Sequence, residues 1–432
     1  MGAAMIPNTY ETGAGAAEKA ILVSLVTDQV KRSGADPKHS LEELVSLTET
    51  AGVEVIATLM QQREVPDSRW FVGKGKAQEI KEMAAETGAT TAVFDQELSG
   101  AQVRNLEEEL DLKIIDRTQL ILDIFAGRAK TREGILQVEL AQLSYLLPRL
   151  SGHGKNLSRL GGGIGTRGPG ETKLETDRRH IRDRITELKR QLEAVTQHRT
   201  LHRERRRKAG VVQVALVGYT NAGKSTLLRQ LTAADVLVED KLFATLDPTS
   251  RTLTLPSGKE VLLTDTVGFI QNLPHDLVAA FRATLEEANE ADLLLHISDA
   301  SSPMRERQQK VVEEVLGELG AAGKTTVHVW NKIDLCSSAS LSLLPGGNDS
   351  LRISAFKPND LDKLKEAVED KILGGVCMLR IPASRGDLAS LAYRVGEVIL
   401  QETEDDWLVM TVRLNPADME KWGHPLVPFQ VS

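Results

Sequence analysis

The sequence contains little cysteine and no long apolar run. Cys336 and Cys377 are the only cysteines in 432 residues, and neither has a Cys or His neighbour at the spacing of a metal site. We therefore expect no disulfide framework and a reducing, cytoplasmic location. No run reaches the roughly 18 apolar residues that a membrane helix needs. The N-terminus lacks a basic stretch followed by an apolar core, so no secretory signal is expected.

The net charge of −8 conceals a strong asymmetry. Residues 149–208 contain 17 Lys or Arg against 7 Asp or Glu, a local charge of +10, which leaves −18 on the rest of the chain. A basic module on an acidic body suggests a polyanionic partner. The length of 432 residues is too great for one compact core and suggests roughly three domains.

The first third of the chain alternates between strand and helix patterns. Residues 1–18 are rich in Gly and Ala and are expected to form a loose tail. Strands are expected at 21–27, 53–59, 91–94 and 112–115, and helices at 41–51, 75–87 and 99–110. This order predicts a small parallel α/β domain at 19–117. The turn at 73–76 lacks the spacing of a phosphate-binding loop, so a plain helix entry is the simpler interpretation.

Two apolar seams frame the basic module. They step alternately by three and four residues and consist of Leu136, Leu140, Leu143, Leu147 and Leu150, and of Ile181, Ile185, Leu188, Leu192 and Val195. This spacing is typical of a coiled coil, and the glycine-rich segment 151–172 separates the seams. We predict an antiparallel helical hairpin within 118–209, whose second helix, from about residue 174 to 208, is roughly 50 Å long.

The tip of this hairpin is polar and basic, so it cannot form a core of its own. The RNA-binding candidates at the tip and on the following helix are His153, Lys155, Asn156, Arg159, Arg167, Lys173, Arg178 and Arg179. Glycines let a backbone approach phosphates, and Lys and Arg neutralise their charge. Folded RNA, which offers unstacked bases, is the better target for an irregular loop. A solvated linker and an ordinary charged helix face are the alternatives.

The segment 218–226 has the spacing of a phosphate-binding loop. An apolar, β-branched run precedes it and a helix pattern follows it, which is the context that this motif requires. Backbone N–H groups and the helix N-terminus bind phosphates there. Lys224 is expected to reach the β- and γ-phosphates, and Ser225 to offer a hydroxyl to Mg²⁺. The expected nucleotide contacts are Gly218, Tyr219, Thr220, Asn221, Ala222, Gly223, Lys224, Ser225 and Thr226.

Residues 210–374 form the nucleotide domain, with further motifs at the ends of strands expected at 261–264, 293–297, 326–330 and 351–353. Asp265 is placed to orient a Mg²⁺-bound water, and Gly268 lets the backbone meet the γ-phosphate. Thr245 can bring a second hydroxyl to Mg²⁺, and Thr249 is a weaker candidate. Lys224, Thr245, Asp265 and Gly268 are the expected catalytic residues, with contacts also from Phe243, Ala244, Leu246, Asp247, Thr266 and Val267.

Asn331, Lys332, Ile333 and Asp334 predict selection of guanine. A carboxylate at Asp334 can accept hydrogen bonds from the N1–H and N2–H₂ edge of guanine. Adenine lacks those donors and would leave the charge unpaired. Lys332 is expected to lie over the ring, and Ser354, Ala355 and Phe356 to approach it, with the Ala355 N–H on O6.

Residues 375–432 carry no recognisable chemistry. A strand is expected at 376–381, a helix with the apolar face Leu388, Leu391, Ala392, Val395 and Ile399, a strand at 408–414 and a short helix near 418–422. The chain as a whole is therefore predicted to be α/β: a P-loop GTPase domain, a parallel N-terminal α/β domain with a long helical hairpin, and a small C-terminal α+β domain at 375–432.

The motif set resembles Ras-like GTPases of translation, and the stretches at 41–75, 163–179 and 218–226 resemble the HflX family over about residues 19–374. The family usually has glutamine where Lys173 stands. The resemblance implies GTP hydrolysis coupled to the large ribosomal subunit and a hairpin loop near ribosomal RNA. It also implies splitting or rescue of stalled ribosomes under stress, and Mg²⁺ held by Ser225 and Thr245. We expect a monomer in solution.

Phe269 stands where Ras-like enzymes place a water-orienting glutamine. Since phenylalanine cannot orient water, we expect hydrolysis to be slow alone and stimulated by a partner. Asn221 could also coordinate K⁺ beside the phosphates. Two rival functions stay open: a GTPase of transfer-RNA or ribosomal-RNA processing, and a non-enzymatic RNA-binding protein with a degenerate nucleotide domain. The sequence shows no second catalytic constellation, which argues against the RNA-processing GTPase. Intact Lys224 and Asp265 argue against the non-enzymatic protein.

Overall fold

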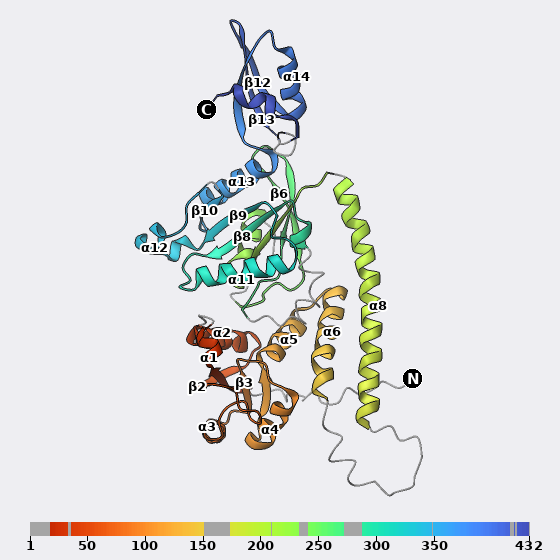
Figure 1. Cartoon of the computed structure of the whole chain (residues 1–432), viewed down its shortest axis with the longest axis vertical. Coiled ribbons are helices and arrows are strands. Elements are labelled where there is room, and N and C mark those ends of the chain that lie inside the picture. Colours follow the sequence, from red (N-terminus) through yellow and green to blue (C-terminus); the bar gives the residue numbers. More distant parts are fainter. Residues whose placement is uncertain are drawn as a thin grey trace. The chain divides into compact units, whose positions relative to one another are not determined.

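A computed structural model describes residues 18–32, 36–150, 173–208, 210–232, 241–271, 287–347, 349–414, 419 and 421–431 (Figure 1). The chain divides into two compact units, Met1–Arg128 with Ile135–Arg190, and Ala129–Gly134 with Gln191–Ser432. The expected tail and hairpin tip, with the candidates His153, Lys155, Asn156, Arg159 and Arg167, lie outside the described residues. The five-part division expected from the sequence stays a prediction.

The first unit contains the predicted parallel sheet. Its strands β1 (Lys19–Val26), β2 (Glu54–Gln62), β3 (Thr91–Phe94) and β4 (Lys113–Asp116) are all parallel in the order β2-β1-β3-β4. The helices α1 (Asp28–Arg32), α2 (Pro37–Thr50), α3 (Lys74–Thr87), α4 (Gly100–Leu110) and α5 (Arg117–Arg128) connect or follow them. Ser99 caps α4 through a reciprocal capping box with Gln102. Gly73 precedes α3 as its N-cap, as expected for a helix entry.

A buried ion network fastens the helices of this unit to its sheet. The Arg117 guanidinium donates to Asp95 at 2.9 Å and also pairs with Glu43. Ser40 donates to the other Asp95 oxygen at 2.7 Å. Each charge therefore has a partner, which offsets the cost of its burial. The network joins α2, α5 and the end of β3.

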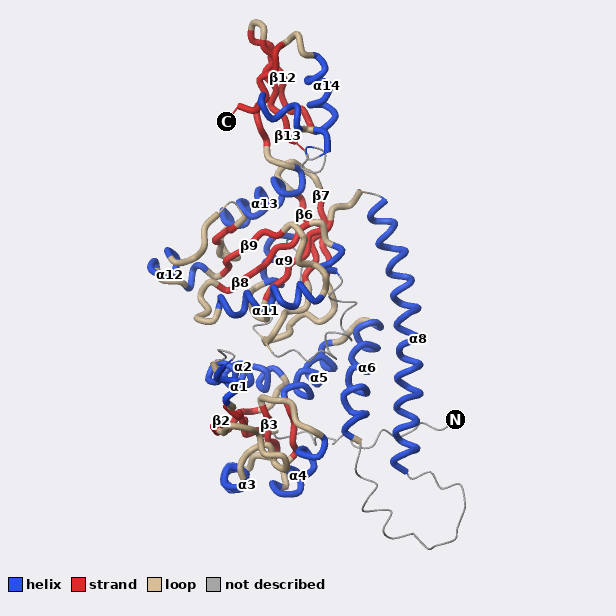
Figure 2. Tube along the Cα trace, in the orientation of Figure 1, coloured by secondary structure: helices blue, strands red, loops and turns tan. Residues whose placement is uncertain are grey.

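The helical hairpin is formed by α6 (Arg132–Arg149) and α8 (Lys173–Lys208). The predicted second helix agrees with α8 to within a residue or two (Figure 2). In the part of α8 that belongs to the first unit, Arg184 donates two hydrogen bonds to Glu139 of α6, at 2.6 and 2.8 Å. Leu188 is fully buried in the same stretch. The predicted apolar seam is therefore used here, with an ion pair beside it.

The second unit contains a six-stranded sheet in the order β10-β9-β8-β5-β7-β6. The strands are β5 (Gln213–Gly218), β6 (Thr249–Thr254), β7 (Glu260–Asp265), β8 (Leu293–Asp299), β9 (Thr326–Asn331) and β10 (Ser350–Arg352). The helices described are α9 (Lys224–Thr232), α11 (Arg305–Glu318), α12 (Ser338–Ser342), α13 (Pro358–Leu373) and the 3₁₀ helix η2 (Ile333–Leu335). All pairs are parallel except the edge pair β6–β7. The carboxyl ends of β5, β7 and β9 therefore meet at one edge, where open α/β sheets bind ligands.

The C-terminal part is a four-stranded antiparallel sheet with one helix packed on it. It comprises β11 (Val376–Pro382), α14 (Gly386–Val395), β12 (Gly396–Glu404), β13 (Trp407–Leu414), η3 (His424–Phe429) and β14 (Gln430–Val431), in the order β12-β13-β11-β14. The expected placement of Ile399 on a helix face is wrong. Gly396 is extended and ends α14, so Ile399 lies in β12 with 52% of its surface exposed.

Glu369 of α13 links this sheet to the turn after β6. Its carboxylate lies 2.6 Å from Arg413 of β13 and accepts the backbone N–H of Ser257 at 2.9 Å. Glu369 is buried, so both partners compensate a charge that has been removed from water.

His296 is a buried polar group in the nucleotide-domain sheet. Its side chain lies in β8, beside His328 of β9, with the ring centroids 5.2 Å apart. Burial lowers the pKa of His296 to about 3, and the nearby His328 and Lys224 act in the same direction. The imidazole is therefore neutral in the folded protein at physiological pH.

His296 should make the sheet less stable in acid. Between a pKa of about 6.5 unfolded and about 3 folded, the unfolded chain binds the extra proton, so stability falls as pH decreases. From pH 7.5 to 5.5, the wild type should lose about 1.4 kcal/mol more than His296→Leu. Urea unfolding without nucleotide, monitored by hydrogen exchange of the peptide that contains β8, measures this difference. The exposed His424 supplies a control, since His424→Gln should retain the wild-type slope, and an equal slope in His296→Leu contradicts the assignment.

Candidate active site

The loop between β5 and α9 is shaped by glycine. Gly223 has φ of +93°, a conformation that L side chains rarely adopt. A Cβ at this position would overlap Nδ2 of Asn331. Gly268, beyond β7, approaches the same loop so closely that its Cβ would lie 2.8 Å from the Cα of Thr220. Side chains at these two positions would push the strand-end loops apart.

Lys224 is the first residue of α9 and is buried. Its ammonium donates to the carbonyl oxygens of Gly218 at 3.0 Å and Tyr219 at 2.8 Å. Burial lowers the pKa of Lys224 to about 8, while Asp265 opposes the shift. The two hydrogen bonds hold the ammonium beneath the loop that a polyphosphate would occupy.

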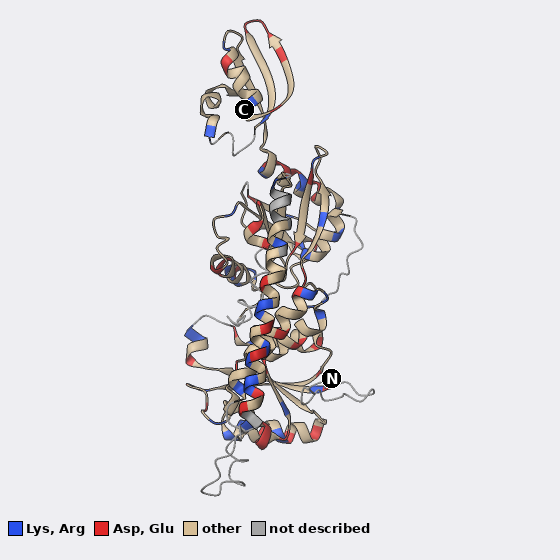
Figure 3. Ribbon diagram, turned by 90° about the vertical axis from the view of Figure 1, so that its right-hand side faces the viewer, with Lys and Arg blue, Asp and Glu red and all other residues tan. Residues whose placement is uncertain are grey.

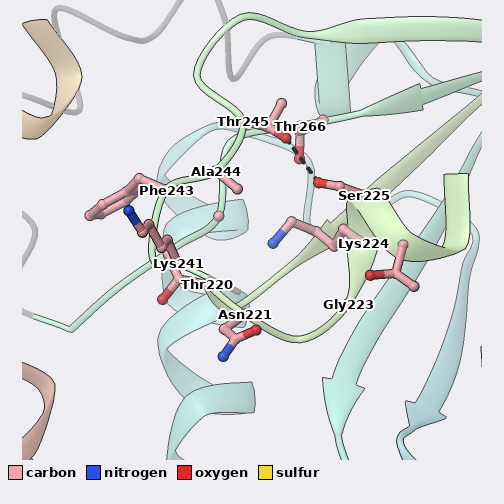
Figure 4. A pocket seen from close by; sticks show the side chains of 12 residues that line it. Thr220, Asn221, Gly223, Lys224, Ser225, Lys241, Phe243, Ala244, Thr245 and Thr266 are labelled. Atoms are coloured by element: carbon pink, nitrogen blue, oxygen red, sulfur yellow. Dashed lines mark hydrogen bonds between the residues drawn. The ribbon is translucent and has the colours of Figure 1, made fainter. Parts of the chain in front are cut away.

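The hydroxyls of Ser225 and Thr245 lie beside Lys224 (Figure 4), and the Asp265 carboxylate accepts a hydrogen bond from each of them. The Ser225 hydroxyl lies 2.9 Å from that of Thr245 and donates to Asp265 at 2.6 Å, and Thr245 donates to the same Asp265 oxygen at 2.8 Å. Burial raises the pKa of Asp265, although Lys224 lowers it. Two hydroxyls and a carboxylate are hard oxygen ligands that suit Mg²⁺. Thr249 instead begins β6, where its backbone pairs with Asp265.

The buried side chain of Asn331 joins the two motifs expected near guanine, Asn331–Asp334 and Ser354–Phe356, to the loop after β5. Its amide donates to the Ala222 carbonyl at 2.9 Å and accepts the Ala355 N–H at 3.2 Å. Lys332 forms an ion pair of 2.8 Å with Asp299, and the Asp334 side chain is exposed. The Ser354 N–H donates to Asp360 at 3.0 Å. Three loops are thus fixed relative to one another at the carboxyl edge of the sheet.

A pocket at this edge is lined by only part of the expected set. Its walls are Thr220, Asn221, Gly223, Lys224, Ser225, Thr226, Lys241, Phe243, Ala244, Thr245, Thr266 and Gly268. The walls thus contain residues expected to bind phosphate, whereas Asn331–Asp334 and Ser354–Phe356 lie outside them. Lys241 was not expected. Its only signal in the sequence is a basic side chain four residues before Thr245.

Phe269 is not among the residues that line this pocket. It is fully buried, and its backbone forms a bridge to the phosphate loop: Thr220 N–H donates to its carbonyl at 2.7 Å, and its own N–H donates to Gly218 at 3.1 Å. Phe269 therefore fixes the loop after β7 through main-chain hydrogen bonds. Its ring offers no polar group to water.

The expected RNA-contacting face of α8 is only partly described. The helix contains 13 Lys or Arg and 6 Asp or Glu, and Figure 3 shows basic residues recurring along it. Arg178 is half-buried and Arg179 is exposed, while Lys173 belongs to the first turn of the helix. None of the described helices is long and apolar enough to cross a membrane.

Comparison with known proteins gives three family matches. Residues 38–126 match a family described as GTP-binding GTPase N-terminal, residues 128–206 one described as GTP-binding GTPase Middle Region, and residues 213–332 one described as 50S ribosome-binding GTPase. Together these matches cover most of the chain between residues 38 and 332.

Individual relatives match over nearly the whole length. GTPase HflX of Caldanaerobacter subterraneus subsp. tengcongensis is 55% identical over 356 residues, which cover 82% of this chain and 81% of that protein. GTPase HflX of Escherichia coli is 45% identical over 398 residues, or 91% of each protein. A solved GTP-binding protein from Sulfolobus solfataricus in complex with GDP aligns with a TM-score of 0.44, at 24% identity over 82% of this chain and 98% of that one.

Replacing Gly223 by alanine should impair nucleotide binding. The added Cβ overlaps Asn331 at a positive φ, and such backbone strain costs about 1–2 kcal/mol. We expect GDP affinity to fall about tenfold or more and the unfolding temperature to decrease, as measured with fluorescent GDP and by thermal unfolding. Gly317→Ala in α11 meets no atom within 4 Å and should leave affinity unchanged. Wild-type affinity in Gly223→Ala would contradict this packing.

Proposed function

Because the chain belongs to the HflX family of GTPases and hydrolyses GTP to GDP and phosphate, we propose that it acts on the large ribosomal subunit, where it splits or rescues stalled ribosomes under stress. The description of the family matched by residues 213–332, 50S ribosome-binding GTPase, supports this proposal. So does the excess of Lys and Arg on α8, since binding to folded RNA depends on neutralising phosphates. We place the protein in the cytoplasm, as a monomer.

The hairpin is the proposed RNA-binding element. Within the described residues, α8 presents the exposed Arg179 and the half-buried Arg178. The candidates of the tip, which lies outside the described residues, extend the same basic set. This charge is the observation that carries the ribosomal part of the proposal, because the rest of the chain is acidic. A solvated helix face would need no such local excess.

The proposed roles in the nucleotide site follow the geometry of its loops. The phosphate loop and Lys224 bind the polyphosphate, and Asp334 accepts hydrogen bonds from guanine. Ser225 and Thr245 would hold Mg²⁺, with Asp265 bonded to both hydroxyls. When bound, the ion would neutralise charge on the transferred phosphoryl group. K⁺ coordination by Asn221 stays a prediction.

Hydrolysis transfers the γ-phosphoryl group of GTP to water and releases GDP. The Gly268 backbone lies beside Thr220 and Lys224, where its N–H can stabilise charge on that group. The buried ring of Phe269 cannot orient the attacking water, so we propose that the ribosome supplies or positions the missing polar group. Hydrolysis by the isolated chain is then slow.

Ribosome binding should depend on the nucleotide. We expect the chain to co-sediment with isolated large subunits in the presence of a non-hydrolysable GTP analogue and to remain in the supernatant with GDP. The same subunits should raise its GTP hydrolysis rate about tenfold or more.

Reversing two charges on α8 should weaken ribosome binding. The double variant Arg178→Glu with Arg179→Glu should co-sediment less with the subunits at low salt, because its carboxylates repel RNA phosphates. Lys365→Glu on α13 provides a charge-reversal control outside the hairpin and should bind like the wild type. Binding that is absent or identical with both nucleotides would refute the ribosomal role.

Base selection should change when Asp334 becomes asparagine. The amide would face the N2 amino group of guanine with a donor, so GTP affinity should fall roughly 10–100-fold. Xanthosine triphosphate carries an oxygen in place of that amino group, so it should bind Asp334→Asn more tightly than it binds the wild type. Competition of both nucleotides against fluorescent GDP measures the change. Asp362→Asn on α13 should behave like the wild type, and undiminished GTP binding in Asp334→Asn would exclude this carboxylate as the guanine ligand.

A further inference from the structure

The carboxylate of Asp247 binds a segment more than a hundred residues earlier in the chain. It accepts the backbone N–H groups of Lys130 at 2.9 Å and Thr131 at 2.8 Å, and the Thr131 hydroxyl donates to its other oxygen. Asp247 is not among the residues that line the phosphate pocket. Its side chain therefore serves a contact other than the nucleotide contact expected from the sequence.

The segment that Asp247 binds leads directly into the hairpin. Residues Ala129–Gly134 belong to the same compact unit as the nucleotide-domain sheet, and α6 begins within them at Arg132. The Thr131 hydroxyl also accepts the Gly134 N–H at 3.0 Å, which is the geometry of a helix N-cap. The N–H groups that Asp247 accepts belong to this N-cap and to the residue before it, and a negative charge next to a helix N-terminus is also favoured by the helix dipole.

Two further contacts hold this segment in place. A Cβ on Gly134 would overlap an oxygen of Asp247, so only glycine permits the approach. Glu133 forms an ion pair of 3.1 Å with Arg199 of α8, and both side chains are largely buried. The start of α6 is therefore held from one side by the loop that contains Asp247 and from the other by α8.

The loop that contains Asp247 also supplies Thr245 to the proposed metal site. Only Leu246 separates the two residues, and it is buried. Phe243, on the other side, is buried with φ of +53°, a conformation that costs free energy for a bulky residue and persists only when its surroundings enforce it. Because a single residue separates them, a shift of Asp247 displaces the backbone that carries the Thr245 hydroxyl.

We propose that Asp247 is a positioning residue for GTP hydrolysis, which fixes Thr245 at the metal site by anchoring its loop to the start of α6. The coupling acts in both directions, because two linked equilibria change each other by the same factor. A nucleotide that favours the described position of Thr245 strengthens the contacts at Lys130 and Thr131. Conversely, a partner that pulls on α6 weakens the hold on Thr245. The proposal goes beyond ribosome binding and does not depend on it.

Nucleotide affinities of Asp247→Asn test the proposal without ribosomes. The amide oxygen can still accept the two N–H groups, but the substitution removes the negative charge and turns a donor toward the Thr131 hydroxyl, which should loosen the anchor. Since γ-phosphate and Mg²⁺ together order such loops whereas GDP does not, affinity for a non-hydrolysable GTP analogue with Mg²⁺ should fall about tenfold. Affinity for GDP should stay within about twofold of the wild type. Thr131→Val, which keeps the backbone donors, should give a smaller loss of the same kind.

An aspartate near the start of a helix outside the nucleotide site supplies the control. Asp387 lies in α14 and pairs with the exposed Arg385, and Asp387→Asn should retain both affinities. Equal weakening of analogue and GDP in Asp247→Asn would indicate a merely structural role and overturn the proposal. Unchanged affinity for both would overturn it as well.

Hydrogen exchange reports the reverse direction of the coupling. In the wild type, amides of residues 129–134 should exchange several-fold more slowly with the GTP analogue than with GDP. Asp247→Asn should abolish this difference, while Asp387→Asn retains it. Equal exchange with both nucleotides in the wild type would show that the start of α6 does not respond to the site, and would overturn the proposal.

Discussion

The nucleotide site depends on one buried amide. Asn331 donates to Ala222 in the loop after β5 and accepts from Ala355 in the loop after β10, so a single side chain joins these two loops. A buried amide left without either partner would cost about 1–3 kcal/mol. This explains why Gly223 must lack a Cβ. The parallel strand order then delivers Lys224 and Asp265 to the same edge.

Much of this arrangement follows from local sequence patterns. Short motifs at the ends of apolar runs indicated which residues would meet, because parallel strands place their carboxyl ends at one edge. The heptad-like seam from Ile181 to Val195 predicted α8, since apolar residues that step alternately by three and four fit a helix and not a strand. The start of α4 is likewise local, because Ser99 and Gln102 form a capping box within four residues. In each case a few neighbouring residues contain the whole signal.

The missed features depend on partners distant in sequence. The strand β6, with the residues TSRTLT, is polar and lies at a sheet edge, so it lacks the apolar run of a central strand. Ile399 continues the helical spacing of α14, yet Gly396 ends that helix and tertiary pairing with β13 decides the outcome. The binding of Asp247 to Lys130 and Thr131 spans more than a hundred residues. No local pattern encodes such a contact.

The ion pair between Glu369 and Arg413 has a consequence for how separable the C-terminal sheet is. A chain ending after α13 would keep Glu369 and its hydrogen bond from Ser257, but would lose the cation that neutralises it. A buried charge deprived of its partner costs about 3–5 kcal/mol, a large fraction of the stability of a typical domain. The last sixty or so residues therefore contribute to the stability of the nucleotide domain through the cation that they supply to Glu369.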